Sequence, residues 1–222
     1  MENIPEFRQE ASQNGIRALF FHPLNPYLLI TKEPVTRFED LKGLRIRTWG
    51  KDMPLLIKAA GARSVNLFLP DLYDALKHGV IDGCPFSTDL MVSYRIYELA
   101  KHVTEVVLWE GPGWGVWISE QSWHKLTPEH QQILLSVAEQ TRQREVKETL
   151  KADKAARMRL KEEGVSFHDF PDSELAKWKA AHPDFFQLLR QRLKQKGLGD
   201  AADKMIRIWK EMIPQISCPD SL

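Results

Sequence analysis

The sequence predicts an α/β fold, in which short strands alternate with helices over the first half and one very long helix opens the second half. Three apolar runs of strand length, rich in β-branched and aromatic residues, stand at 15–21, 27–31 and 44–48. Helical segments with clear starts and stops follow them. A strand–helix–strand order of this kind favours a parallel sheet covered by helices.

Capping residues, prolines and glycines indicate where the helices and strands of the first half begin and end. Thr36 and Glu39 fit a capping box, in which hydroxyl and carboxylate satisfy free backbone donors, and Gly43 supplies the stop of this short helix. The helices that follow start at prolines and end at glycines. The elements predicted after Gly43 are a helix at 54–60, a strand at 64–69, a helix at 70–78 and a strand within VIDGCPF.

The second half is mainly helical. Thr127-Pro128-Glu129 is a strong helix start, and no helix breaker follows before Gly164. The apolar positions of this helix change register between Ala138 and Val146, which predicts a kink or a change of packing partner there. Beyond it we expect a strand at 165–170 and helices near 173–181, 184–196 and 200–213.

Composition excludes several classes of protein. The 222 residues are 43% hydrophobic and 27% charged, which indicates a folded chain of one or two domains. Thirty-one basic against 30 acidic residues give a formal charge of +1, so we expect no nucleic-acid partner. The first residues lack the apolar run of an export signal, and no stretch approaches 18 apolar residues. Taken alone, these features predict a chain that is neither exported nor membrane-spanning.

Catalytic motifs are absent from the sequence. It contains no nucleophile elbow, zinc-protease helix, phosphate loop or dinucleotide fingerprint, and its seven histidines are dispersed. Cys84 follows Asp82-Gly83 at a strand end, but nothing in the sequence supplies it with a base, so a packed thiol is the preferred interpretation. We therefore expect no enzyme, no cofactor and no metal site.

Arg47 is the most informative polar residue. It ends the apolar strand LRIRT at the edge where ligands of open α/β sheets gather, with Arg45 on the same face two residues earlier. A guanidinium there can pair with both oxygens of a carboxylate, although an exposed arginine could also be a solvated strand end.

Aromatic residues gather near the same predicted strand ends, as in clefts for organic ligands. For Phe68 and Trp117 we favour an ordinary core position, whereas Trp49 and Trp109 look more exposed. The full set is Tyr27, Trp49, Phe68, Phe86, Trp109, Trp114 and Trp117. The segment WEGPGWG suits a crossing or hinge between lobes.

The motifs in order are EPVTRFEDLKGLRIRT, AAGA, LPDLYDALKHGVIDG, ELAKHVT and WHKLTPEHQQ. In this combination the chain resembles the DctP family, the solute-binding proteins of TRAP transporters, from about Gly15 to Ile213. The resemblance implies a type II periplasmic-binding-protein-like clamp of two lobes, with the long helix across both. It implies residues 25–110 plus 151–222 for the C-terminal lobe, and 1–24 plus 111–150 for the long helix and an incomplete N-terminal lobe.

The resemblance also assigns ligand-binding positions. The family's carboxylate-binding arginine falls on Arg47, a polar or aromatic contact falls on Phe86, and the wall before the YDAL helix falls on Leu69. A second arginine used for acidic sugars falls near Tyr27, so this pocket is less cationic and more aromatic. With Trp49 and Trp109 as further walls, we expect a monocarboxylate or 2-oxo acid in preference to a sialic-acid-like sugar.

Two functions follow. The first is a periplasmic receptor that captures a small organic acid for the membrane subunits of a TRAP permease. The alternative is an interaction module, truncated or encoded by a split gene, which associates with a separate lobe or with itself. Ligand-dependent stabilisation of a monomer would favour the receptor, and a ligand-indifferent dimer would favour the module.

Overall fold

The computed structural model describes residues 5–110 and 112–212, and its contacts divide the chain into two units. Residues 17–182 form the sheet unit, and residues 1–16 with 183–222 form the helical unit. The lobe boundaries implied by the sequence stay a prediction. Among the described residues, no helix combines the length and apolarity needed to cross a membrane.

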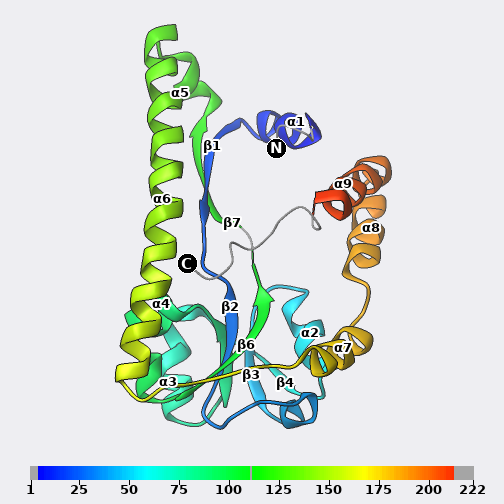
Figure 1. Cartoon of the computed structure of the whole chain (residues 1–222). Helices are drawn as coiled ribbons and strands as arrows, with labels where there is room; N and C mark the ends of the chain where they lie inside the picture. The colour runs from blue at the N-terminus through cyan, green and yellow to red at the C-terminus, as the bar shows by residue number, and fades with distance from the viewer. Residues whose placement is uncertain (1–4, 111, 213–222) are drawn as a thin grey trace. The chain divides into compact units, whose positions relative to one another are not determined.

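A six-stranded sheet is the centre of the sheet unit (Figure 1). Its order is β4 (Arg63–Asn66), β3 (Arg45–Thr48), β5 (Gly83–Phe86), β2 (Tyr27–Thr31), β6 (His102–Trp109) and β8 (Ser166–His168). Strand β3 runs parallel to β4 and β5, whereas β2 runs antiparallel to both β5 and β6. The prediction of a parallel sheet is confirmed for β3, β4 and β5 and is wrong for β2. The chain reaches β2 directly from β1 (Ile16–Pro23), without a crossover helix that would give it a parallel direction.

Strand β2 is buried on both faces and separates two apolar cores. Leu28 and Ile30 belong to one core, which includes residues of α3 (Leu72–Lys77) and α4 (Thr88–Ser93). Leu29 belongs to the other core, with residues of α2 (Met53–Ala59) and α7 (Asp172–Ala181). Helices thus cover the sheet on both faces, as the sequence predicts.

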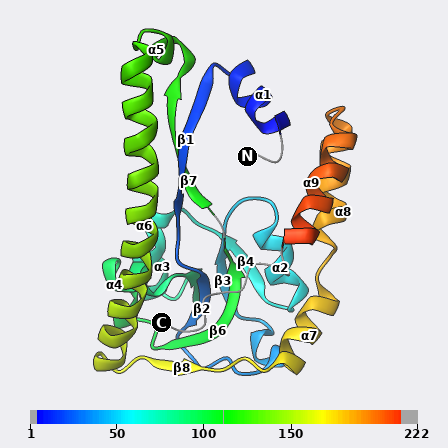
Figure 2. The same ribbon diagram turned by 45° about the horizontal axis from the view of Figure 1, so that its top comes forward.

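The long helix α6 (Pro128–Glu162) is a single element of 35 residues and continues through the predicted change of register. At 1.5 Å per residue it extends about 52 Å. Thr127 caps its start by accepting a hydrogen bond from the His130 amide at 3.2 Å. In Figures 1 and 2 it runs beside the two-stranded sheet of β1 and β7 (Pro112–Ser119), near the short helix α5 (Glu120–His124), and reaches α4.

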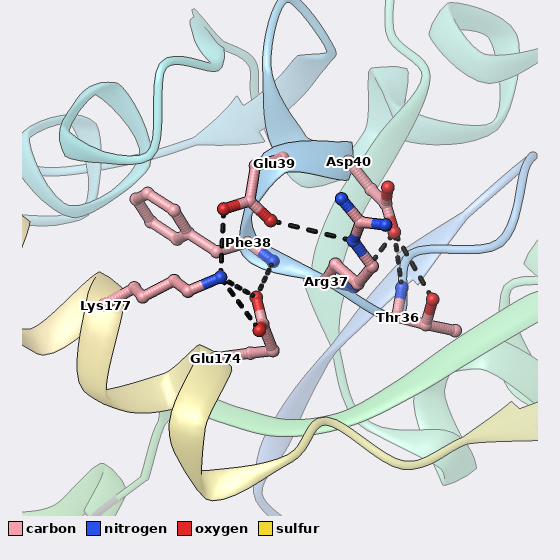
Figure 3. A network of polar contacts seen from close by, with 7 residues as sticks. All are labelled: Thr36, Arg37, Phe38, Glu39, Asp40, Glu174 and Lys177. Carbon is pink, nitrogen blue, oxygen red and sulfur yellow. Dashed lines mark hydrogen bonds and ion pairs between the residues drawn. The ribbon is translucent and has the colours of Figure 1, made fainter.

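A polar network fastens α7 to the short 3-10 helix η1 (Phe38–Leu41), which precedes β3 (Figure 3). Glu174 accepts a hydrogen bond from the Phe38 amide at 2.9 Å, and Lys177 pairs with Glu174 at 2.9 Å and with Glu39 at 3.0 Å. Bonds to the backbone and to Lys177 lower the pKa of the Glu174 carboxyl.

The predicted capping box of Thr36 and Glu39 is wrong by one residue (Figure 3). Asp40 accepts the hydrogen bonds of the Thr36 amide at 3.0 Å and the Arg37 amide at 2.9 Å. Because η1 starts at Phe38, the carboxylate that reaches back to the free amides is that of Asp40, and Glu39 points to Lys177 instead.

The remaining 3-10 helices are η2 (Leu69–Asp71) and η3 (Ile96–Glu98). The helical unit contains α1 (Pro5–Gln13), α8 (Phe185–Gln195) and α9 (Gly199–Met212). Helices α8 and α9 are linked by the ion pair of Arg190 and Asp203 at 2.5 Å and by the rings of Phe186 and Trp209, whose centroids lie 6.2 Å apart. Lys204 of α9 pairs with Glu6 of α1 at 2.9 Å.

Candidate ligand-binding site

Arg47 lies near the carboxyl end of β3 and is 7% exposed. Its Nε donates a hydrogen bond to the Leu67 carbonyl oxygen at 3.3 Å, and its guanidinium lies 4.7 Å from the centroid of a Trp49 ring. Burial lowers the pKa of Arg47, because it disfavours the charged form. A guanidinium nevertheless stays protonated in proteins, so the site holds a partly desolvated positive charge.

This charge has no carboxylate partner in the part of the chain that the structure describes, and neither terminal nitrogen of Arg47 donates a hydrogen bond there. The only fully buried side-chain nitrogen or oxygen without a partner among those residues is Arg17 Nε. The terminal nitrogens of Arg47 therefore keep access to solvent and to a ligand.

Arg45, two residues earlier, is used differently. Its Nε donates to Asp82 at 2.9 Å and its terminal nitrogen pairs with the other Asp82 oxygen at 2.5 Å. It also donates to the Gly79 carbonyl oxygen. The pair lowers the pKa of the Asp82 carboxyl. Of the two arginines on this strand, only Arg47 is free to bind an anion.

Four aromatic side chains predicted for the site lie together beside Arg47. Tyr27 is the centre, and its ring centroid lies 5.7 Å from those of Trp49 and Phe86 and 5.1 Å from that of Trp109. Each of these contacts is edge-on, the geometry that aromatic pairs prefer. Phe86 is fully buried, and the other three are half-buried. We call these four residues the aromatic wall.

The sheet topology explains why residues so far apart in sequence meet. Strands β3 and β5 are parallel and end at the same edge, which brings Arg47 and Phe86 there. Strand β2 starts at this edge because it is antiparallel to β5, with Leu28 opposite Phe86. Tyr27 in turn pairs with Trp109 at the end of β6.

Other positions depart from the sequence analysis. Leu69 starts η2 and packs, half-buried, on the core that includes Phe86, so its role as a wall stays a prediction. The core positions expected for Phe68 and Trp117 are wrong, because these side chains are 81% and 41% exposed. Phe68 follows the end of β4, and Trp117 lies on β7 of the two-stranded sheet. The Trp114 side chain lies outside the described residues.

Tyr94 is the residue that sequence reasoning missed. It follows α4, and its ring lies edge-on to Phe86 with centroids 5.5 Å apart. No local pattern marks a single tyrosine at a helix end, so only the folded structure reveals this contact.

The groups that could support catalysis or metal binding are differently placed. Cys84 is fully buried, and burial raises the pKa of its thiol to about 12, as for a packed thiol. The rings of His102 and His168 hydrogen-bond to each other at 2.9 Å. Across residues 5–110 and 112–212, no three His, Cys, Asp or Glu side chains are grouped so that they could hold a metal ion.

A hollow of about 310 Å³ lies away from Arg47, between β1 and α6, and is lined by residues that include Phe21, His22 and Arg142. Its two basic side chains already have acidic partners, since His22 pairs with Glu145 at 2.8 Å and Arg142 with Glu139 at 2.6 Å, and Glu110 adds a carboxylate to the lining. The hollow is less suited to an anion than the site at Arg47.

Solved structures place this fold in a known class. The chain superposes with a TM-score of 0.80 on a TRAP periplasmic solute-binding protein from Desulfovibrio salexigens with bound orotic acid, at 20% identity over 97% of this chain and 68% of that one. A Citrobacter koseri TRAP periplasmic solute-binding protein with bound D-glucuronate gives a TM-score of 0.71 at 24% identity, over 90% of this chain and 65% of the other. The fold is that of the TRAP periplasmic solute-binding proteins, which confirms the predicted fold class.

The sequence comparisons identify the family. The chain belongs to the bacterial extracellular solute-binding protein family 7, DctP, whose profile matches residues 4–189. A solute-binding protein of Albidiferax ferrireducens is 26% identical over 151 residues, which are 66% of this chain and 44% of that protein. The chain thus spans less than half the length of this relative.

Proposed function

We propose that this protein is the solute-binding component of a TRAP-type transporter and captures a small organic carboxylate through Arg47. The observation that carries the proposal is a buried guanidinium beside the aromatic wall, without a carboxylate partner among the described residues. Burying a charge without a counter-ion costs free energy, so such a group is typical of a site that its ligand completes.

The guanidinium geometry favours a carboxylate. Its two terminal nitrogens form a planar fork that matches the two oxygens of a carboxylate, and such charge-assisted bonds are about twice as strong as neutral ones. Because Nε is fixed by the Leu67 carbonyl oxygen and the plane lies over Trp49, the fork has a defined orientation. Binding then needs no covalent step, in keeping with a transport receptor.

The comparisons support this proposal. Orotic acid and D-glucuronate, the ligands bound in the two neighbouring structures, both carry one carboxyl group. For this chain we propose a carboxylate of the same kind, captured in the periplasm and delivered to the membrane subunits of a TRAP permease. Ligand contacts that favour one conformation of the receptor would couple binding to delivery by population shift.

The alternative of an interaction module remains a prediction. Exposed apolar side chains lie along α6, including those of Ile133, Val137 and Met158, and such surfaces can bind a partner. Light scattering after size exclusion tests self-association. A dimer whose thermal stability is indifferent to carboxylates would favour the module over the receptor.

Thermal denaturation with paired ligands tests the receptor. Orotate is compared with uracil, which has the same ring without the carboxylate, and D-glucuronate is compared with D-glucose. We expect at least one acid to raise Tm while its neutral counterpart does not, because a ligand at 100 times its Kd stabilises by about 2.7 kcal/mol. Equal shifts for acid and neutral ligand, or no shift with any acid, would argue against the proposal.

A further inference from the structure

The most exposed large apolar side chain in the described part of the chain lies beside the Arg47 site. Phe68 is 81% exposed and follows Leu67, whose carbonyl oxygen accepts the hydrogen bond of Arg47 Nε. It has no ring contact with another aromatic residue among those described. Tyr94, at 39% exposed, adds a second accessible ring, which lies edge-on to Phe86.

Two polar side chains near the site, Asn25 and Thr48, are committed to other groups. Asn25 donates to Asp89 at 3.0 Å and to the Thr149 carbonyl oxygen at 3.1 Å. Thr48, next to Arg47, shares a hydrogen bond of 2.8 Å with Ser64. These two side chains are therefore not free to pair with hydroxyl groups of a ligand, and each hydroxyl left unpaired in such a site weakens binding.

From these observations we infer that the Arg47 site selects a carboxylate with a flat, unsaturated body, and that Phe68 contacts that body. The inference rests on the proposed function and adds the class of ligand to it. The aromatic wall holds its rings by mutual edge-on contacts, so their positions are fixed before the ligand arrives. A flat ring can stack on such surfaces or meet their edges, whereas a puckered ring presents hydrogen atoms on both faces and cannot stack closely.

Benzoate and cyclohexanecarboxylate test the inference. The two acids have the same carboxylate and the same number of carbon atoms, and they differ in flatness and π electrons. Titration calorimetry on the whole chain should give about threefold to tenfold tighter binding of benzoate, the factor that aromatic pairing contributes beyond buried area. Phe68→Ala should weaken the binding of benzoate by a similar factor and the binding of cyclohexanecarboxylate by less. Phe68→Tyr should bind benzoate as the unchanged protein does.

Val80→Ala is the matched control. Val80 is 48% exposed and lies in the loop between α3 and β5. This loop leads to the start of β5, whereas Phe86 stands at its other end. Its loss should change neither affinity. Because Phe68 and Val80 are both exposed, neither substitution is expected to impair folding, and circular dichroism checks this.

The outcomes separate this inference from the proposed function. If both acids bind equally and Arg47→Met abolishes both, the preference for flat ligands is overturned while the carboxylate receptor stands. Unchanged benzoate affinity in Phe68→Ala overturns the role of Phe68. If no carboxylate binds the chain in an Arg47-dependent manner, the proposed function fails and the inference fails with it.

Discussion

Replacing Arg47 by methionine should remove ligand binding while leaving the protein about as stable as before. The unliganded protein would lose a hydrogen bond of 3.3 Å to the Leu67 carbonyl oxygen and the contact with Trp49. The first contributes about 1 kcal/mol and the second about 0.5–2 kcal/mol. Against these stands the cost of desolvating a charge, several kcal/mol for a fully buried ion. We expect the free energy of unfolding to change by about 1 kcal/mol or less, in either direction.

Binding should respond much more strongly. Truncating one partner of a desolvated, hydrogen-bonded charge pair costs about 2–5 kcal/mol, which is about a 30-fold loss of affinity or more. Titration calorimetry with the acid that most raises Tm, together with urea unfolding, measures both quantities. An affinity within threefold of the unchanged protein, or a loss of stability above about 3 kcal/mol, would refute the reasoning.

Arg45→Met is the matched control on the same strand. This side chain is partly exposed and pairs with Asp82, so its loss should lower Tm and leave carboxylate affinity unchanged. If Arg45→Met removed carboxylate binding and Arg47→Met did not, the assignment of Arg47 as the ligand-binding arginine would be contradicted.

Three further predictions concern stability and reactivity. Thr127→Ala should lower the free energy of unfolding by about 0.5–2 kcal/mol in urea titrations, because it removes the cap of α6, and Thr127→Ser should not. Lys177→Met should lower Tm at pH 7, and the difference in Tm between the variant and the unchanged protein should shrink below about pH 4. The reason is that the pKa of Glu174 is lowered in the folded protein, so its contribution to stability is present above the unfolded pKa and is lost as pH falls through the folded pKa. A difference in Tm that is independent of pH would count against the network. In a Cys218→Ser variant, Cys84 should resist iodoacetamide at pH 8 until the chain is unfolded, because burial raises the pKa of its thiol to about 12; equal alkylation rates in the native and unfolded protein would contradict this.

Local sequence signals account for most of the element boundaries. Thr127-Pro128 starts α6, and Gly164 with its positive φ lies two residues after the last helical residue, Glu162, since both signals act through neighbouring backbone groups. The direction of β2 was beyond such signals. It depends on which strands lie on either side of β2, and no local propensity encodes that arrangement. The capping residue of η1 was missed by one position because a 3-10 turn begins later than the helix that the motif predicts.

The candidate site was partly visible in the sequence for a related reason. Arg47, Phe86 and Trp109 stand at strand ends, and strand ends that meet at one sheet edge bring such residues together. Phe68 also lies near the end of a predicted strand, but this position does not reveal its exposure, and Tyr94 carries no such signal. Whether an aromatic residue beside a strand is buried or exposed depends on the layer that covers it, which is a property of the tertiary structure.

The most direct test of the account is a crystal structure of this chain with the carboxylate that calorimetry selects. We expect the two carboxylate oxygens within about 3 Å of the terminal nitrogens of Arg47, with the body of the ligand against the aromatic wall. A ligand found instead in the hollow between β1 and α6, with no anion at Arg47, would contradict the account.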